Sequence, residues 1–83
     1  MAINMDYSKL VNKTQAQIFG ENLARYMDKT GKTKKELVLY LQADPKTVKL
    51  WLKGVRRPQL EHSRKISEWL GVELNDLYLD YKN

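Results

Sequence analysis

The sequence has no cysteine, and its 83 residues include only two prolines and one histidine. The lack of cysteine excludes disulfides and thiol catalysis, and it fits a reducing compartment. The longest uninterrupted apolar run covers only residues 37–41, whereas a membrane span needs about 20 residues. Residues 1–12 also lack the basic-then-apolar layout of a signal peptide. We therefore expect a cytoplasmic chain with no membrane segment.

Groups that would carry catalysis or bind a metal are equally scarce. The single histidine, His62, has no partner ligands at a suitable spacing in the sequence. No nucleophile, base and orienting residue form a recognisable set. We therefore expect no enzyme activity, no cofactor, no metal and no small-molecule ligand. A chain of this length fits a single domain.

Charge, in contrast, is abundant and unevenly distributed. The net charge of the chain is +5, and residues 32–57 alone hold eight basic and two acidic residues. This central segment thus carries +6, and the rest of the chain carries −1. A concentrated positive patch attracts polyanions, of which nucleic acid is the commonest. A solvated lysine-rich surface would have the same charge, so charge alone leaves both interpretations open.

Capping and turn signals divide the chain into helix-sized segments, and no segment alternates as a strand would. Two capping boxes, in which a side chain and a backbone N–H satisfy each other, are formed by Thr14 with Gln17 and by Thr33 with Glu36. We expect helices at about 14–29, 33–41, 44–53, 59–70 and 74–81. The sequence therefore predicts an all-α, compact five-helix bundle over residues 14–83. For residues 1–13 the sequence leaves two interpretations, an N-terminal arm or a short extra helix.

The segment 44–53 has two unlike faces. Asp44 as N-cap and Pro45 at the first helical position mark its start. At about 100° per residue, one face carries the apolar set Val48, Trp51 and Leu52, and the other carries Lys46, Lys49, Leu50 and Lys53. Only two or three residues join this helix to the preceding one. Two helices joined in this way can cross steeply, which leaves the second exposed for a DNA groove.

An ordered set of residues resembles the lambda-repressor/Cro-like (XRE-type) helix-turn-helix family. The set comprises residues 33–37, then Leu41, Asp44, Thr47, Val48, Trp51, Gly54 and Pro58, with matching segments at 19–23 and 66–77. The resemblance covers about residues 18–79. It implies a transcriptional regulator, typically a phage- or mobile-element-like repressor, that inserts its third core helix in the major groove of double-stranded DNA. It also implies a homodimer on a palindromic operator.

The resemblance further implies roles for individual residues. The base-contacting positions fall on Pro45, Lys46, Lys49 and Leu50. The backbone-contacting positions fall on Thr33, Lys34, Lys35, Thr47, Lys53, Arg56 and Arg57. Candidates for a dimer interface, or alternatively for the core, are Leu77, Tyr78 and Tyr81.

Three positions depart from the family pattern. Gln42 stands where the family often has glycine, and a left-handed residue there would cost about 1 kcal/mol, so we expect an altered turn. Pro45 and Leu50 stand where the family often has polar residues. Hydrogen bonds to bases would then come from the lysines, and Leu50 could make only an apolar contact, such as one with a thymine methyl. These departures keep an alternative open, a protein-interaction module such as an antitoxin or accessory factor. Single-stranded nucleic acid is a third option, but exposed aromatic platforms are not evident.

Overall fold

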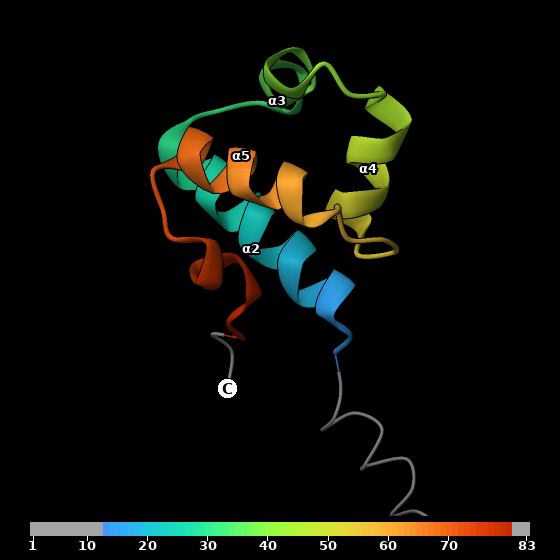
Figure 1. Ribbon diagram of the computed structural model, residues 1–83, viewed down its shortest axis with the longest axis vertical. Helices are drawn as coiled ribbons and strands as arrows, with labels where there is room; N and C mark the ends of the chain where they lie inside the picture. Colours follow the sequence, from blue (N-terminus) through green and yellow to red (C-terminus); the bar gives the residue numbers. More distant parts are fainter. Residues whose placement is uncertain (1–12, 81–83) are drawn as a thin grey trace, which may run out of the picture.

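The computed structural model describes residues 13–80. These residues form four α-helices and one short 3₁₀ helix, and they contain no strand (Figure 1). The elements are α2 (Gln15–Thr30), α3 (Lys34–Leu41), α4 (Pro45–Lys53), α5 (Leu60–Leu70) and η1 (Leu74–Tyr78). The predicted all-α fold is confirmed. The described residues contain four α-helices where five helices were predicted, because the fifth predicted helix is a short 3₁₀ helix. The predictions for residues 1–12 and for Tyr81 lie outside the described residues.

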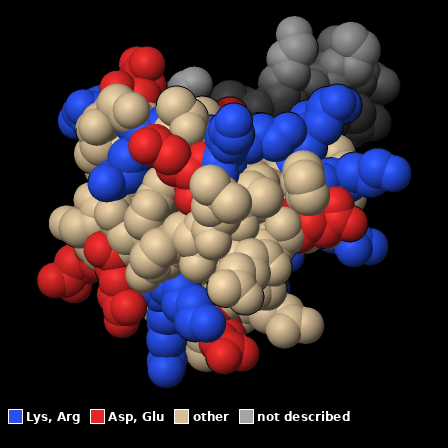
Figure 2. All heavy atoms as spheres, turned by 90° about the horizontal axis from the view of Figure 1, so that it is seen from above, with Lys and Arg blue, Asp and Glu red and all other residues tan. Residues whose placement is uncertain are grey.

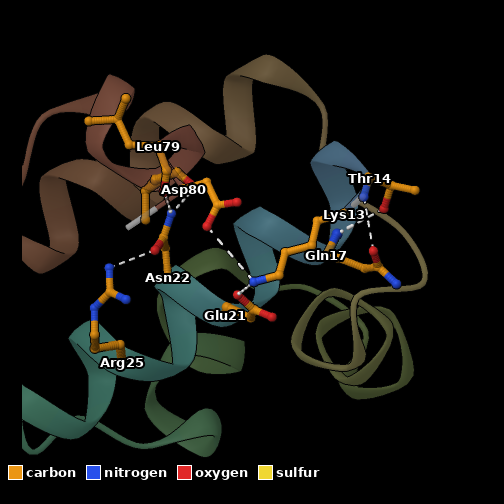
Figure 3. Close-up of polar contacts among 9 residues, drawn as sticks. Lys13, Thr14, Gln17, Glu21, Asn22, Arg25, Leu79 and Asp80 are labelled. Atoms are coloured by element: carbon orange, nitrogen blue, oxygen red, sulfur yellow. Dashed lines mark hydrogen bonds and ion pairs between the residues drawn. The ribbon is translucent and has the colours of Figure 1, made fainter. Parts of the chain in front are cut away.

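The predicted helix starts are confirmed by hydrogen bonds at the caps. The Gln17 N–H donates to Thr14 Oγ1 at 3.1 Å, and the Thr14 N–H donates to Gln17 Oε1 at 2.9 Å (Figure 3). At the start of α3, the Glu36 N–H donates to Thr33 Oγ1 at 3.2 Å, and the Thr33 N–H donates to Glu36 Oε1 at 2.8 Å. Each capping box satisfies two backbone donors that the helix itself cannot pair.

Helix α2 lies at the centre of the fold and contacts α4, α5 and η1 (Figure 1). Its buried Phe19, Leu23 and Met27 follow the helical period, so one face of α2 supplies much of the core. Helix α3 closes the top of the bundle, where it contacts α4 and α5. The remaining core residues come from the other elements and include Leu37, Leu41, Val48, Trp51, Ile66, Leu70 and Leu77.

The end of the chain is held against α2 by a buried amide. Asn22 is 2% exposed, and its Nδ2 donates to the carbonyls of Leu77 and Leu79 at 2.9 and 2.8 Å (Figure 3). Because these carbonyls accept from a side chain, they do not carry a further helical turn, and Leu79 is extended. This arrangement explains why the last helix stops at Tyr78, short of its predicted end.

The turn between α3 and α4 differs from expectation. Gln42 takes the left-handed conformation with φ 54° and ψ 44°, so the prediction of an altered turn is wrong. The Gln42 N–H donates to the Leu39 carbonyl at 3.3 Å, and the Ala43 N–H donates to the Val38 carbonyl at 3.1 Å. These bonds pair helix-end carbonyls, and they offset the conformational cost of a non-glycine residue. The short helix-turn-helix connection is therefore retained.

Candidate nucleic-acid interface

Helix α4 is fixed to the bundle by its apolar face. Val48 has no exposed surface, and Trp51 is 2% exposed, with its ring centroid 5.6 Å from that of His62 on α5. The backbone of α4 also lies very close to α2. A Cβ built on Gly20 would stand 2.5 Å from the Trp51 carbonyl oxygen, so the close approach requires glycine there. Buried packing and this close approach together determine which face of α4 points outward.

The outward face of α4 carries the lysines. Pro45, Lys46, Lys49 and Lys53 are exposed, and Leu50 is half-buried. None of the three lysines forms an ion pair within residues 13–80. The two-faced helix predicted for residues 44–53 is thus confirmed in its exposure pattern. The assignment of these residues to base contacts stays a prediction.

Basic residues also flank this helix on two sides. At the start of α3, Lys35 is exposed and Lys34 is half-buried, and Arg56 and Arg57 are exposed in the loop after α4. Figure 2 looks down on α3 and shows Lys and Arg side chains gathered toward the side on which α4 lies in Figure 1. The protein therefore places positive charge both on α4 and on the segments beside it.

The two threonines among the predicted backbone contacts are less available. The Thr33 hydroxyl accepts from the Glu36 N–H and donates to Glu36 Oε1 at 3.2 Å, so it already serves the helix cap. Thr47 is half-buried and lies about 100° around α4 from Lys46, at the flank of the lysine face. Their contact with a DNA backbone stays a prediction.

A shallow hollow separates the starts of α3 and α4. Its volume is about 430 Å³, and it is lined by Thr33, Lys34, Lys35, Val38 and Pro45. In the fold Val38 is half-buried, packs against the core on one side and lines this hollow on the other. The short turn after α3 brings the two helix starts together, and this is a tertiary effect that no local pattern signals.

The fold gives the predicted dimer residues Leu77 and Tyr78 different degrees of burial. Leu77 has no exposed surface, so it is a core residue and has nothing to offer a second copy. Tyr78 is half-buried, because its ring lies 5.3 Å from that of Phe19 and its hydroxyl hydrogen-bonds the Ser63 hydroxyl at 2.8 Å. Tyr81 lies outside the described residues.

Residues 13–80 contain no group of three or more histidine, cysteine or acidic residues that could hold a metal ion. Within that range no helix has the length and apolar character that crossing a bilayer requires. The most distinctive surface is therefore the basic one formed by α4 and its neighbours.

The fold of the chain is similar to that of a known transcriptional repressor. No protein-family model matches the sequence, and no curated protein matches it. A solved structure does match: that of the SOS-response transcriptional repressor LexA from Eubacterium rectale, at a TM-score of 0.76 and 30% sequence identity. The match covers 87% of this chain and 78% of that one. The chain belongs to the helix-turn-helix repressor fold family.

Within this helix-turn-helix fold, α3 and α4 are the two helices of the motif, and the Gln42 turn joins them. The second helix is the one whose lysine face is exposed. The similarity supports a helix-turn-helix repressor fold without separating the lambda-repressor/Cro-like family from its relatives.

Proposed function

We propose that the chain is a sequence-specific, double-stranded DNA-binding transcriptional regulator of the lambda-repressor/Cro-like family. Helix α4 enters the major groove, and the lysine and arginine residues beside it contact the phosphates on either side. Bound at an operator, the protein represses transcription by occupying the DNA. This proposal assigns it no catalytic role.

One observation carries the proposal. The exposed lysines of α4 project from a helix whose opposite face is buried in the core, so the fold presents them as a rigid unit. A helix of this width fits the major groove, and lysine and arginine contacts to phosphate supply most of the affinity for DNA. The similarity to a transcriptional repressor gives independent support.

We further propose that two copies bind a palindromic operator. In a symmetric complex, two recognition helices about 34 Å apart enter successive major grooves on one side of the duplex. Because Leu77 is buried, the contact between copies would be made by other surface residues. Tyr78 and Tyr81 are the candidates, together with exposed Leu79, which follows Tyr78 in the sequence.

The test combines selection of bound duplexes from a random pool with a gel-shift assay of the selected sequence. The double variant Lys46→Ala/Lys49→Ala should lose about tenfold or more in affinity, since each base contact is worth about 1–3 kcal/mol. Lys65→Ala, which removes an exposed lysine from α5, is the matched control and should bind as the unaltered chain does. Equal affinity of the double variant and the control would refute the proposal. A symmetric selected sequence would support the two-copy complex.

A second candidate function is a protein-interaction module, such as an antitoxin or accessory factor. It is favoured by an apolar surface away from the lysine face of α4. Leu39 is 69% exposed and Tyr40 is 47% exposed, and the Tyr40 ring stacks on Trp69 with centroids 6.0 Å apart. Stoichiometric binding of one protein that Leu39→Glu abolishes, without any duplex preference, would favour this candidate over DNA binding.

A further inference from the structure

The exposed face of α4 is unusual in its hydrogen-bonding chemistry. Its outward side chains are those of Pro45, Lys46, Lys49, Leu50 and Lys53. A lysine ammonium only donates hydrogen bonds, and the proline and leucine side chains neither donate nor accept. The face therefore contains no hydrogen-bond acceptor.

The nearest acceptor side chain, that of Asp44, uses one carboxylate oxygen for the helix cap. Asp44 precedes α4 as its N-cap, and its Oδ1 accepts from the Lys46 N–H at 2.9 Å. Thr47 has a hydroxyl, but it is half-buried and lies about 100° around the helix from Lys46, at the flank of the lysine face. The lysines and Leu50 therefore have no acceptor among them, and the Thr47 hydroxyl at the flank is predicted to contact the DNA backbone.

This chemistry limits what the helix can read in a major groove. There, guanine presents two adjacent acceptors, N7 and O6, and thymine presents an acceptor and a methyl group. Adenine presents one acceptor, N7, beside an amino donor, and cytosine presents an amino donor. A face of donors and apolar groups is therefore most complementary to the paired acceptors of guanine and to the thymine methyl. It has nothing to accept a hydrogen bond from an adenine or cytosine amino group.

Leu50 is suited to the methyl contact by its position. It follows Lys49 directly and lies one helical turn after Lys46, and it is half-buried, so its side chain is supported by the protein surface. A supported leucine loses little side-chain freedom when it packs on a methyl group. A methyl-bearing base would therefore lie beside a base that a lysine contacts.

We propose that α4 recognises its operator through guanine N7 and O6 and through a neighbouring thymine methyl, and that it does not recognise the amino groups of adenine or cytosine. Lys46 and Lys49 donate to guanine, and Leu50 contacts the methyl. This inference rests on the proposed function, since it specifies which duplexes the same helix selects.

The experiment replaces single atoms in the half-site of the selected duplex and measures affinity for the full-length chain. Uracil in place of thymine removes only the methyl group, and at one position it should weaken binding by about fourfold. The nucleobase 7-deazaguanine removes the N7 acceptor and should weaken binding by about fivefold or more. Replacing adenine with 2-aminopurine moves the amino group out of the major groove and should leave affinity unchanged.

Protein variants assign each effect to its residue. In Leu50→Ala, the thymine and uracil duplexes should bind equally well, while 7-deazaguanine still weakens binding. For one of the two variants Lys46→Ala and Lys49→Ala, the guanine and 7-deazaguanine duplexes should bind with equal affinity, while uracil still weakens binding. Circular dichroism melting of each variant checks that the fold is retained.

Two outcomes would overturn the inference, and they differ. A selected sequence that binds specifically but responds to 2-aminopurine, or not to uracil, would refute the reading rule and leave the proposed function standing. If no duplex is bound selectively, the proposed function and this inference both fail.

Discussion

At the scale of single residues, Gln42 is the position where local conformation and residue type disagree. It holds φ 54° at the end of α3, a region where a side chain costs about 1–2 kcal/mol and glycine costs little. The turn keeps this conformation because the flanking Leu41 and Ala43 pack in or against the core. Core packing on both sides therefore outweighs the local preference of one exposed residue.

Replacing Gln42 with glycine should consequently stabilise the chain. We expect Gln42→Gly to raise the free energy of unfolding by about 1 kcal/mol, since it removes the cost of the left-handed conformation. Urea denaturation followed by circular dichroism measures the change. Gln42→Ala is the control, because it deletes the same exposed side chain but keeps a Cβ, and it should change stability by only a few tenths of a kcal/mol. A loss of stability in Gln42→Gly would show that the side chain has a structural role.

Whether the role of a single residue can be predicted from the sequence depends on how far along the chain its partner lies. Thr14, Thr33 and Asp44 act within three residues of themselves, and the caps predicted for them are present. Asn22 acts across 55 residues through its bond to the Leu77 carbonyl, and nothing in the spacing of the sequence signals that contact. Local hydrogen bonds are therefore predictable here, while a buried polar contact between chain ends is not.

At the scale of elements, α4 has an N-cap with two opposing consequences. The Asp44 carboxylate satisfies the Lys46 N–H at 2.9 Å, which stabilises the start of the helix. The same negative charge lies at the edge of a basic surface, where it would repel phosphate. The cap thus supports the fold while reducing attraction to DNA under the proposed function.

Two substitutions at Asp44 separate these effects. Asn caps a helix about as well as Asp, so Asp44→Asn should keep the stability of the chain and raise its affinity for duplex DNA at low salt. Asp44→Ala loses the cap and should cost about 1 kcal/mol of stability. Thermal melting and a gel-shift assay on both variants measure the two quantities. Weaker binding by Asp44→Asn would indicate instead that the carboxylate contacts a base.

One part of the candidate site could be predicted from the spacing within a single helix, and another part could not. The exposed face of α4 followed from helical spacing alone, because the apolar positions Val48 and Trp51 had to face inward. The hollow between α3 and α4 did not, because it depends on how the two helices cross after Gln42. The five-residue η1 was predicted in place but not in type. The carbonyl of Leu77 in η1 and that of Leu79 after it accept from Asn22 rather than from a following helical turn.

At the scale of the whole molecule, the distribution of charge matters more than its total. The net charge is +5, but residues 32–57 carry +6, and these residues form α3, α4 and the loops beside them. A molecule of this kind is attracted to any duplex by its phosphates, and it gains selectivity only from the residues that reach base edges. General attraction and selectivity should therefore depend on different residues.

Salt dependence distinguishes the two sets of residues. Arg56 and Arg57 are exposed in the loop after α4. If each contacts a phosphate, each should contribute about 0.9, for every bound copy, to the magnitude of the slope of log affinity against log salt concentration. We expect Arg56→Ala or Arg57→Ala to reduce that slope and to weaken binding to the selected duplex and to a random duplex by the same factor. Lys49→Ala should instead weaken mainly the selected duplex, because it removes a base contact. Gel-shift titrations at several salt concentrations give both slopes, with Lys65→Ala as the charge-matched control. An arginine variant that loses affinity only for the selected duplex would place that arginine at a base edge and would contradict its assignment to the DNA backbone.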